Sequence, residues 1–418
     1  MGKQLWFRCS GVAVAAVAVA AVAVAGLTAA LSGGSAEAGP AAATARVVGR
    51  RLAVSAEVSN AAVARAANQA PEVAVASAMS PRQLAGQRVI YAYSGLTPPS
   101  RLLSLIRQGD VGGVIFFAAN YQSSSQFTAA VSQLEAANQA ATNPARDYPL
   151  LLMTDQEGGS VRRLPGAPVQ SEQWIGSGST ASGRAYQARQ AGSGAAASLL
   201  SYGLNVNLAP VLDVYRTPGD FDDQYQRSYS MSPQVVSTLG ADFIRAQQRA
   251  GVAATAKHFP GLGAATASQN TDLGPVTIRV SKATLQSDDE YPYQAAIGAD
   301  VDLVMVSWAA YPQLGSTLPA GLSPTIVQGQ LRTRLGFHGV TITDAIGAGA
   351  LAAYGSTRAR ALMAAEAGMQ LILASDSVSQ GTECMNALGA GFRDGELPSA
   401  AFRATVAQIL TLRSSLRP

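Results

Sequence analysis

The chain contains 418 residues, of which 48% are hydrophobic and 13% are charged, so it is long enough to bury one large core or two ordinary ones. Its formal net charge of +4 comes with no basic run and no interleaving of aromatic and basic residues, which argues against a nucleic-acid partner. Cys9 and Cys384, the two cysteines, have neither the number nor the spacing of a disulfide framework or a zinc site, so we expect no metal.

The first 38 residues have the pattern of an export signal. Lys3 and Arg8 precede an uncharged run over residues 11–31, and residues 36–38 form a small-x-small cleavage site. We therefore expect a signal peptide over residues 1–38 and a secreted, extracytoplasmic protein. Because the apolar run is long for a signal, an uncleaved anchor that keeps this segment in contact with the membrane is the alternative.

Residues 39–78 are rich in alanine and lack a firm hydrophobic period, which predicts a flexible spacer, with partial helix formation as the alternative. The compact domain is expected to cover residues 79–418. Its first helix is expected to begin at Ser80, because a serine hydroxyl is a preferred N-cap and Pro81 suits the first helical position.

Short apolar runs then alternate with longer amphipathic stretches. The apolar runs predict buried strands over residues 88–94, 111–118, 148–154, 206–214, 252–257, 303–308, 339–343 and 370–374. The helix-like stretches cover residues 99–107, 126–140, 183–202, 233–249, 323–335, 356–366 and 398–412. This alternation predicts an α/β fold with a parallel sheet, and eight units predict a single (β/α)₈ TIM barrel. An open doubly wound sheet is the alternative.

A TIM barrel places its functional groups directly after its strands, at the carboxyl-end face. Polar side chains occur at these points of the sequence: Asp155 and Glu157 after the third run, Asp213 in the fourth, Lys257 and His258 at the end of the fifth, and Asp344 after the seventh. The loop after the fourth run adds Asp222 and Arg227. We therefore expect one polar site at this face.

Asp344 ends a strand pattern that has room for a carboxylate only at the barrel mouth. Beside Lys257 and Arg227 it would be held ionised, as the nucleophile of a retaining glycosidase must be. The alternative is a cap for a helix over residues 345–351. Asp155 suits hydrogen bonds to sugar hydroxyls, because an ionised carboxylate accepts several at once; the alternative is a residue that starts a turn.

Lys257 and His258 stand side by side in a chain with only two histidines and three lysines. They end an apolar strand and precede a Phe-Pro-Gly sequence that continues neither a strand nor a helix. The alternative to a functional pair is a lysine that extends to solvent beside a packed imidazole. Glu157 and Arg162 are expected to pair with each other and hold the turn after the third strand.

Several motifs occur in a fixed order. They are Asp155-Gln156-Glu157-Gly158-Gly159-x-Val161-x-Arg163, Asn207-Leu208-Ala209-Pro210-Val211-x-Asp213, Arg227-Ser228-Tyr229, Lys257-His258-Phe259-Pro260-Gly261 and Thr343-Asp344. This set resembles glycoside hydrolase family 3, and within it the single-barrel bacterial β-N-acetylglucosaminidase (β-N-acetylhexosaminidase) branch. In the first motif, either Arg162 or Arg163 matches the arginine of the family.

The resemblance implies an enzyme that hydrolyses terminal β-linked N-acetylglucosamine or related sugars through a covalent intermediate. Asp344 matches the catalytic nucleophile of the family, and Asp155, Arg227, Lys257 and His258 match the groups that bind the sugar hydroxyls. No metal or organic cofactor is implied. The expected partner is a carbohydrate, from the cell wall or from exogenous glycan fragments, and the expected state is a monomer.

The loop over residues 262–272 departs from the family. In the branch that the chain resembles, this loop ends in Asp-Ser-His, and its last histidine is the general acid/base. Here it contains no histidine and ends in Asn270-Thr271-Asp272. Asp272 is its one ionisable side chain and is our candidate acid/base, because a carboxyl enclosed in a partly dry site has the raised pKa that an acid needs. The alternatives are a glycan-binding barrel without catalysis and an envelope-anchored structural protein.

Overall fold

The computed structural model describes residues 70–142 and 144–416, and the predicted export signal and most of the predicted spacer lie outside them. Within the described residues, no helix combines the length and hydrophobicity that crossing a membrane requires. The end of the segment predicted as a spacer forms helix α2 (Ala70–Ala78), which packs against the C-terminal helix α14 (Ser399–Ser415). Arg403 of α14 donates to the carbonyl of the buried Ala76 at 2.8 Å, so the packed domain already includes α2.

The predicted helix start at Ser80 is confirmed. Ser80 Oγ accepts a hydrogen bond from the Gln83 amide at 3.2 Å, and Gln83 Oε1 accepts one from the Ser80 amide at 3.0 Å. This reciprocal capping box opens helix α3 (Pro81–Gly86), with proline at the first helical position.

Eight parallel strands form the central sheet, and each coincides with one of the predicted runs. They are β1 (Val89–Tyr91), β2 (Gly113–Ile115), β3 (Leu151–Thr154), β6 (Val206–Asn207), β7 (Ala253–Phe259), β8 (Leu303–Val306), β11 (Val340–Thr343) and β12 (Ile372–Ala374). Short antiparallel pairs lie outside this sheet: β4 (Gln156–Gly158) with β5 (Val161–Arg162), and β9 (Ala310–Tyr311) with β10 (Ser316–Pro319).

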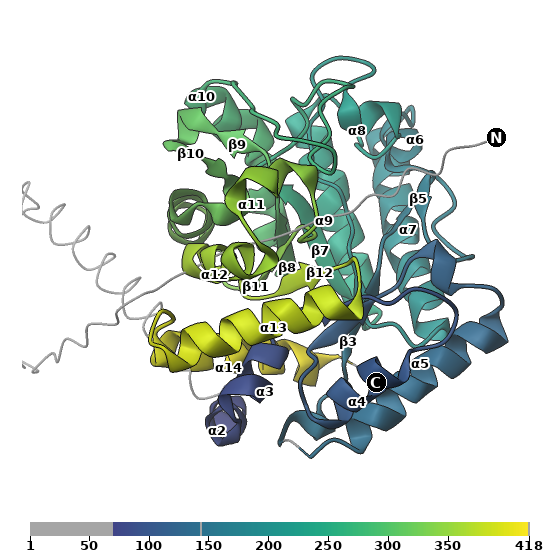
Figure 1. Ribbon diagram of the computed structural model, residues 1–418. Coiled ribbons are helices and arrows are strands. Elements are labelled where there is room, and N and C mark those ends of the chain that lie inside the picture. Colours follow the sequence, from purple (N-terminus) through teal and green to yellow (C-terminus); the bar gives the residue numbers. More distant parts are fainter. Residues whose placement is uncertain (1–69, 143, 417–418) are drawn as a thin grey trace, which may run out of the picture.

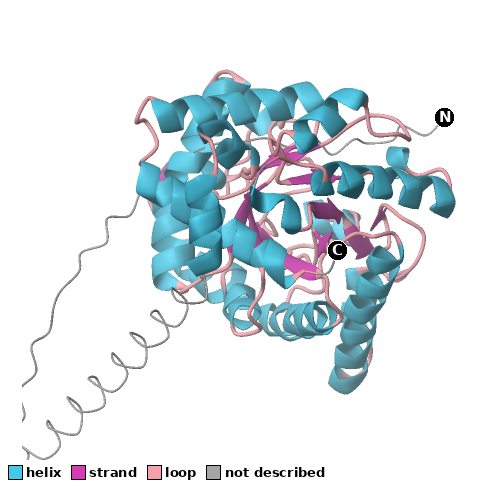
Figure 2. Cartoon of the chain, turned by 90° about the horizontal axis from the view of Figure 1, so that it is seen from below, coloured by secondary structure: helices cyan, strands magenta, loops and turns pink. Residues whose placement is uncertain are grey.

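The neighbours in the sheet follow the order β11-β8-β7-β6-β3-β2-β1-β12. Its two ends meet: Ile342 of β11 forms a parallel bridge with Leu371, and the Thr343 amide donates to the Leu371 carbonyl at 3.0 Å. The sheet is therefore a nearly closed barrel, as the sequence predicted, and not an open doubly wound sheet. Figure 2 shows the strands in the centre of the molecule with the helices around them.

The outer helices largely match the predicted stretches. These are α4 (Ser100–Arg107), α5 (Ser124–Gln139), α7 (Ala181–Ser201), α9 (Pro233–Arg249), α12 (Thr357–Ala367) and α14, while the stretch 323–335 forms the π-helix η6 (Thr325–Arg334). Helices α11 (Tyr291–Ile297) and α13 (Val378–Arg393) were not among those predicted. Shorter elements are α6 (Glu172–Gly176), α8 (Phe221–Gln224), α10 (Lys282–Thr284), η1 (Ala118–Asn120), η2 (Pro144–Asp147), η3 (Leu285–Asp289), η4 (Pro312–Leu314), η5 (Ala320–Leu322) and η7 (Gly349–Tyr354).

Helix α14 closes one end of the barrel. The inner core consists of apolar side chains from all eight strands, and Ile409 and Leu412 of α14 belong to the same cluster. The completely buried Arg413 donates to the carbonyls of Pro149 and Tyr148, directly before β3. Because α14 covers the amino ends of the strands, a ligand site inside the barrel must open at the carboxyl ends (Figure 1).

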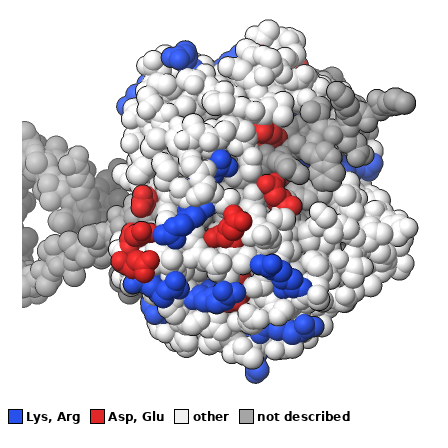
Figure 3. All heavy atoms as spheres, viewed as in Figure 1, with Lys and Arg blue, Asp and Glu red and all other residues white. Residues whose placement is uncertain are grey.

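Charges of both signs are intermingled on the face seen in Figure 3. Arg358 and Glu396 form an ion pair at the surface, at 3.6 Å. Proteins that bind nucleic acid instead collect basic residues into a patch or stripe. On the face seen here, basic and acidic residues occur together.

Candidate active site

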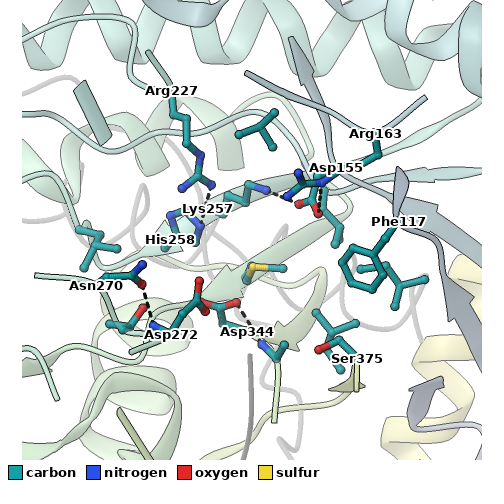
Figure 4. A pocket seen from close by; sticks show the side chains of 18 of the residues that line it. Phe117, Asp155, Arg163, Arg227, Lys257, His258, Asn270, Asp272, Asp344 and Ser375 are labelled. Atoms are coloured by element: carbon teal, nitrogen blue, oxygen red, sulfur yellow. Dashed lines mark hydrogen bonds and ion pairs between the residues drawn. The ribbon is translucent and has the colours of Figure 1, made fainter. Parts of the chain in front are cut away.

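A pocket with about 620 Å³ of empty space, part of it open to solvent, lies at the carboxyl ends of the strands. Every residue predicted for the site lines it: Asp155, Arg227, Lys257, His258, Asp272 and Asp344 (Figure 4). The barrel thus collects side chains from β7 and from the segments after β3, β6, β7 and β11 around one cavity. This is the face at which TIM barrels place their chemistry.

Lys257 is a buried cation shared by two carboxylates. Its Nζ lies 2.8 Å from Asp155 Oδ1 and 2.7 Å from Glu157 Oε1, and its side chain is only 2% exposed. Burial would lower the pKa of the ammonium, but the two carboxylates outweigh it and raise that pKa. The alternative in which Lys257 extends to solvent is therefore wrong.

Glu157 joins this lysine to Arg227. The Arg227 guanidinium donates to both Glu157 oxygens, each at 2.9 Å, in the bidentate geometry that gives strong, well-oriented pairs. Burial opposes ionisation of Glu157, but Arg227 and Lys257 hold the pKa of its carboxyl well below the usual value. The predicted pair of Glu157 with Arg162 is wrong: Arg162 is exposed and donates to the Gly166 carbonyl at 2.8 Å.

Asp155 presents an ionised carboxylate to the pocket. Burial would raise its pKa, but Lys257 and Arg163 outweigh this effect and lower it. Arg163 Nε lies 3.7 Å from Asp155 Oδ2 and lines the pocket, so of the two adjacent arginines it is Arg163 that belongs to the site. Since its side chain is held by cations, Asp155 does more than start a turn.

His258 is oriented by Asp213, which the sequence analysis placed at this face of the barrel without giving it a role. The His258 Nδ1 and Asp213 Oδ2 atoms are 2.6 Å apart, and Asp213 Oδ1 also accepts from the Leu262 amide at 2.6 Å. Because a carboxylate only accepts, Nδ1 carries the proton in this contact. Nε2 then accepts from Arg227 Nη2, which lies 3.4 Å away. The available signal was the position of Asp213, in the fourth predicted run.

Asp222 completes the buried polar group. Its Oδ1 lies 3.3 Å from Arg227 Nη1. Burial and the nearby Asp213 raise the pKa of Asp222 to about 7. Oxygen and nitrogen atoms of Asp213, Asp222 and His258 lie within 4.8 Å of one another, a spacing that suits a metal ion. However, the Arg227 guanidinium already contacts both Asp222 and His258, and its charge would repel a cation there. The donor set fits a hydrogen-bonded network better than a metal site.

Asp344 follows β11, and it lines the same pocket as Lys257 and Arg227. Its Oδ1 accepts a hydrogen bond from the neighbouring Ala345 amide at 3.0 Å, and among the described residues it forms no ion pair. The helix that follows, η7, begins after Ala348 and has no side-chain cap. The alternative in which Asp344 caps a helix is therefore wrong.

The loop over residues 262–272 reaches the pocket, and Asn270, Thr271 and Asp272 are part of its lining. Asn270 Oδ1 accepts from the Asp272 amide at 2.8 Å, so it holds the backbone of Asp272. The half-buried Asp272 and the buried Asp344 thus belong to one cavity although they lie 72 positions apart in the sequence (272 and 344).

Phe117 and Ser375 line the pocket as well and were missed in the sequence. Both come just after strands, β2 and β12. The rule that strand ends face the site would have marked them. Phe117 was instead included in an apolar run, 111–118, because a phenylalanine at a strand end has the same pattern as one inside the strand.

This is a TIM-barrel protein. Its pocket is lined by buried cations, by carboxylates that pair with them, and by the two aspartates Asp272 and Asp344. The family profile described as "Glycosyl hydrolase family 3 N terminal domain" matches residues 83–412, and the chain belongs to glycoside hydrolase family 3. The family predicted from the motifs is therefore confirmed, and with it the assignment as a glycoside hydrolase.

The names of proteins with similar sequences agree with this family assignment. The chain is 44% identical to an "Uncharacterized secreted glycosyl hydrolase" of Arthroderma benhamiae over 84% of this chain and 97% of that protein. It is 34% identical to a "Beta-hexosaminidase" of Xanthomonas oryzae pv. oryzae over 63% of this chain and 76% of that protein.

Two solved structures are also similar. The glycoside hydrolase family 3 β-N-acetylglucosaminidase of Paenibacillus sp. str. FPU-7 superposes with a TM-score of 0.75 at 31% identity; the match covers 81% of this chain and 63% of that one. The β-N-acetylhexosaminidase of Beutenbergia cavernae gives a TM-score of 0.72 at 30% identity, covering 80% of this chain and 99% of that one. The predicted likeness to this branch is confirmed.

We expect Glu157→Gln to destabilise the fold strongly. The change removes the carboxylate that both Lys257 and Arg227 contact. Removing one partner from a group of buried charges lowers the free energy of unfolding by about 3–5 kcal/mol. Asp242→Asn is the control, because the Arg189–Asp242 pair at 2.6 Å is largely exposed on the arginine side and such pairs are worth about 0–1 kcal/mol. Urea unfolding at neutral pH measures both.

The deficit of Glu157→Gln should depend on pH. The folded pKa of Glu157 is depressed, so its contribution is present above the ordinary glutamate value of 4.5 and is lost as the pH falls below it. The difference from wild type should therefore shrink in acid. If Glu157→Gln and the control Asp242→Asn have equal free energies of unfolding at neutral pH, the role assigned to Glu157 is contradicted.

Proposed function

We propose that this protein is an exported retaining β-glycosidase that removes terminal β-linked N-acetylglucosamine or a related sugar. In this proposal Asp344 is the nucleophile and Asp272 is the general acid/base. The observation that carries the proposal is that both carboxyl groups line one pocket together with the polar set Asp155, Lys257 and His258. A pair of carboxyl groups at a sugar-binding pocket is what glycoside hydrolysis requires.

The polar set would bind the terminal sugar. Asp155 is ionised and accepts hydrogen bonds from hydroxyl groups, whereas Lys257 and Arg163 donate to hydroxyl oxygens. Lys257 and Arg227 are fixed by Glu157, so the sugar meets groups that are already oriented. Such preorganisation reduces the free-energy cost of ordering the site during the reaction.

In the first step, Asp344 attacks the anomeric carbon and forms a carbon–oxygen bond to it. The bond to the leaving oxygen breaks, and that oxygen takes the proton of the Asp272 carboxylic acid. The Ala345 amide holds Asp344 Oδ1, which fixes the carboxylate in the pocket and leaves Oδ2 for the attack.

In the second step, the ionised Asp272 accepts a proton from water. The resulting oxygen attacks the anomeric carbon, and the bond to Asp344 breaks. Asp344 recovers its charge and Asp272 its proton, so the two steps together add one water to the glycosidic bond. Two displacements at one carbon return the β configuration.

The names of similar proteins support the substrate and the location. Two of the relatives compared above are called a β-hexosaminidase and a β-N-acetylglucosaminidase, and another is called a secreted glycosyl hydrolase. The charged and apolar pattern of residues 1–38 supports export as well. We include in the proposal a monomer acting on cell-wall or exogenous glycan fragments.

A glycan-binding barrel without catalysis is the competing function. It is favoured by one observation, the absence of histidine from the loop over residues 262–272. Loss of proton transfer typically costs about 10²–10⁴ in rate. The two functions differ in whether a bound aryl β-glycoside is turned over.

We expect Asp344→Asn to reduce the turnover of nitrophenyl β-N-acetylglucosaminide by roughly 10³-fold or more, because a neutral amide is a poor nucleophile. The variant should keep its melting temperature within a few degrees and still bind the sugar, since the change is nearly isosteric. A 2-fluoro sugar with a good leaving group should add one glycosyl unit to Asp344 of the wild type, detectable by peptide mass spectrometry. Full hydrolysis by the variant would refute the assignment; binding without turnover by the wild type would favour the glycan-binding barrel.

We expect Asp272→Asn to separate two kinds of substrate. Alkyl glycosides and disaccharides need a proton on the leaving oxygen and should be cleaved about 10²–10⁴-fold more slowly. Formation of the glycosyl-enzyme from nitrophenyl glycosides needs no such proton and should be spared, and azide should restore its breakdown because it attacks without a base. Steady-state and pre-steady-state kinetics measure both effects. Equal loss on both substrates would mean that Asp272 holds structure or sugar instead of a proton.

A further inference from the structure

The loop that carries Asp272 is fastened at both ends, and the two attachments reach different parts of the barrel. At its base, the Leu262 amide donates to Asp213 at 2.6 Å and the Phe221 amide donates to the Ala265 carbonyl at 2.9 Å. These contacts tie the loop to the segment after β6, which also carries Arg227. The base of the loop is therefore fixed to the sugar-binding side of the pocket.

At its tip, the loop is attached to the segment that follows the nucleophile. The Gly349 amide donates to the Asp272 carbonyl at 2.8 Å, and the Ala350 amide donates to the Thr271 carbonyl at 3.0 Å. Gly349 lies five positions after Asp344 (344 and 349) and begins η7. The same stretch of backbone thus extends from the nucleophile to the loop that carries the candidate acid.

The tip fits only because position 349 has no side chain. A Cβ at Gly349 would lie 2.3 Å from the Leu273 carbonyl oxygen and 2.4 Å from its carbon. Both contacts are with backbone, so the loop would have to move away as a unit. Gly349 does not have a positive φ, so alanine is compatible with its own conformation and the clash with the loop is the main effect.

We propose that Gly349 is a positioning residue for the acid/base, because its bare backbone docks the Thr271–Asp272 tip and sets the place of Asp272 relative to Asp344. This inference rests on the proposed function, since it needs Asp272 to transfer a proton. It explains how a loop with many small residues holds a catalytic group. Without the docking, Asp272 would lie outside reach of the leaving oxygen, and a displacement of about 1 Å costs on the order of 10²-fold in rate.

The test compares Gly349→Ala with Gly274→Ala, and Asp272→Asn serves as the reference. Gly274 lies just beyond the loop, two positions after Asp272, and a Cβ there would meet no heavy atom within 4 Å. Gly349→Ala should cleave alkyl glycosides about 10²-fold more slowly while it still forms the glycosyl-enzyme from nitrophenyl glycosides at nearly the wild-type rate. Its rates should also respond to azide as those of Asp272→Asn do. Gly274→Ala should match the wild type on both substrates.

If Gly349→Ala does not fold, Asn270→Ala replaces it, because that variant removes the 2.8 Å hydrogen bond to the Asp272 amide at the same tip. It should show the same dependence on the leaving group. Suppose that Gly349→Ala folds and that its rates on alkyl and nitrophenyl glycosides fall equally, or that neither rate falls. If Asp272→Asn still shows its dependence on the leaving group, this result overturns the inference. If Asp272→Asn itself shows no dependence on the leaving group, the proposed acid role fails first.

Discussion

Two buried cations that share one carboxylate determine the arrangement of this site. Lys257 and Arg227 both contact Glu157, and Lys257 also contacts Asp155. Charges that are removed from water are tolerated only when they are paired and hydrogen-bonded. Strand β7, the β4–β5 hairpin and the segment after β6 must therefore meet in one geometry, and Asp155 is held ionised at the wall of the pocket as a result.

The same network connects this wall of the pocket to the loop over residues 262–272. Arg227 contacts His258, His258 contacts Asp213, and Asp213 accepts from the Leu262 amide at the start of the loop. The loop then continues to Asp272, whose backbone is docked on Gly349. In the proposed mechanism, the position of the acid thus depends on the buried charges at one end and on the nucleophile segment at the other.

Much of the fold follows from the sequence because eight apolar runs alternate with longer amphipathic stretches, and each of these runs contains a strand. The gathering of polar side chains around one pocket followed from one rule, that polar residues after barrel strands converge. Pairing inside the site did not follow: Glu157 contacts Arg227, 70 positions away, instead of the nearby Arg162. The separation of two residues in the sequence does not indicate which cation lies next to a given carboxylate in the folded barrel. The packing of helix α2 against the domain did not follow either, since its alanine-rich sequence lacks the apolar period that usually marks a packed helix.

The proposed mechanism is a double displacement at the anomeric carbon with Asp344 as the nucleophile. Its stereochemical consequence can be observed directly by proton NMR of the first sugar released from a β-aryl N-acetylglucosaminide, before the free sugar equilibrates its anomers. Double displacement releases the β-anomer first. Initial release of the α-anomer would mean a single displacement by water, and would contradict the assignment of Asp344 as a covalent nucleophile.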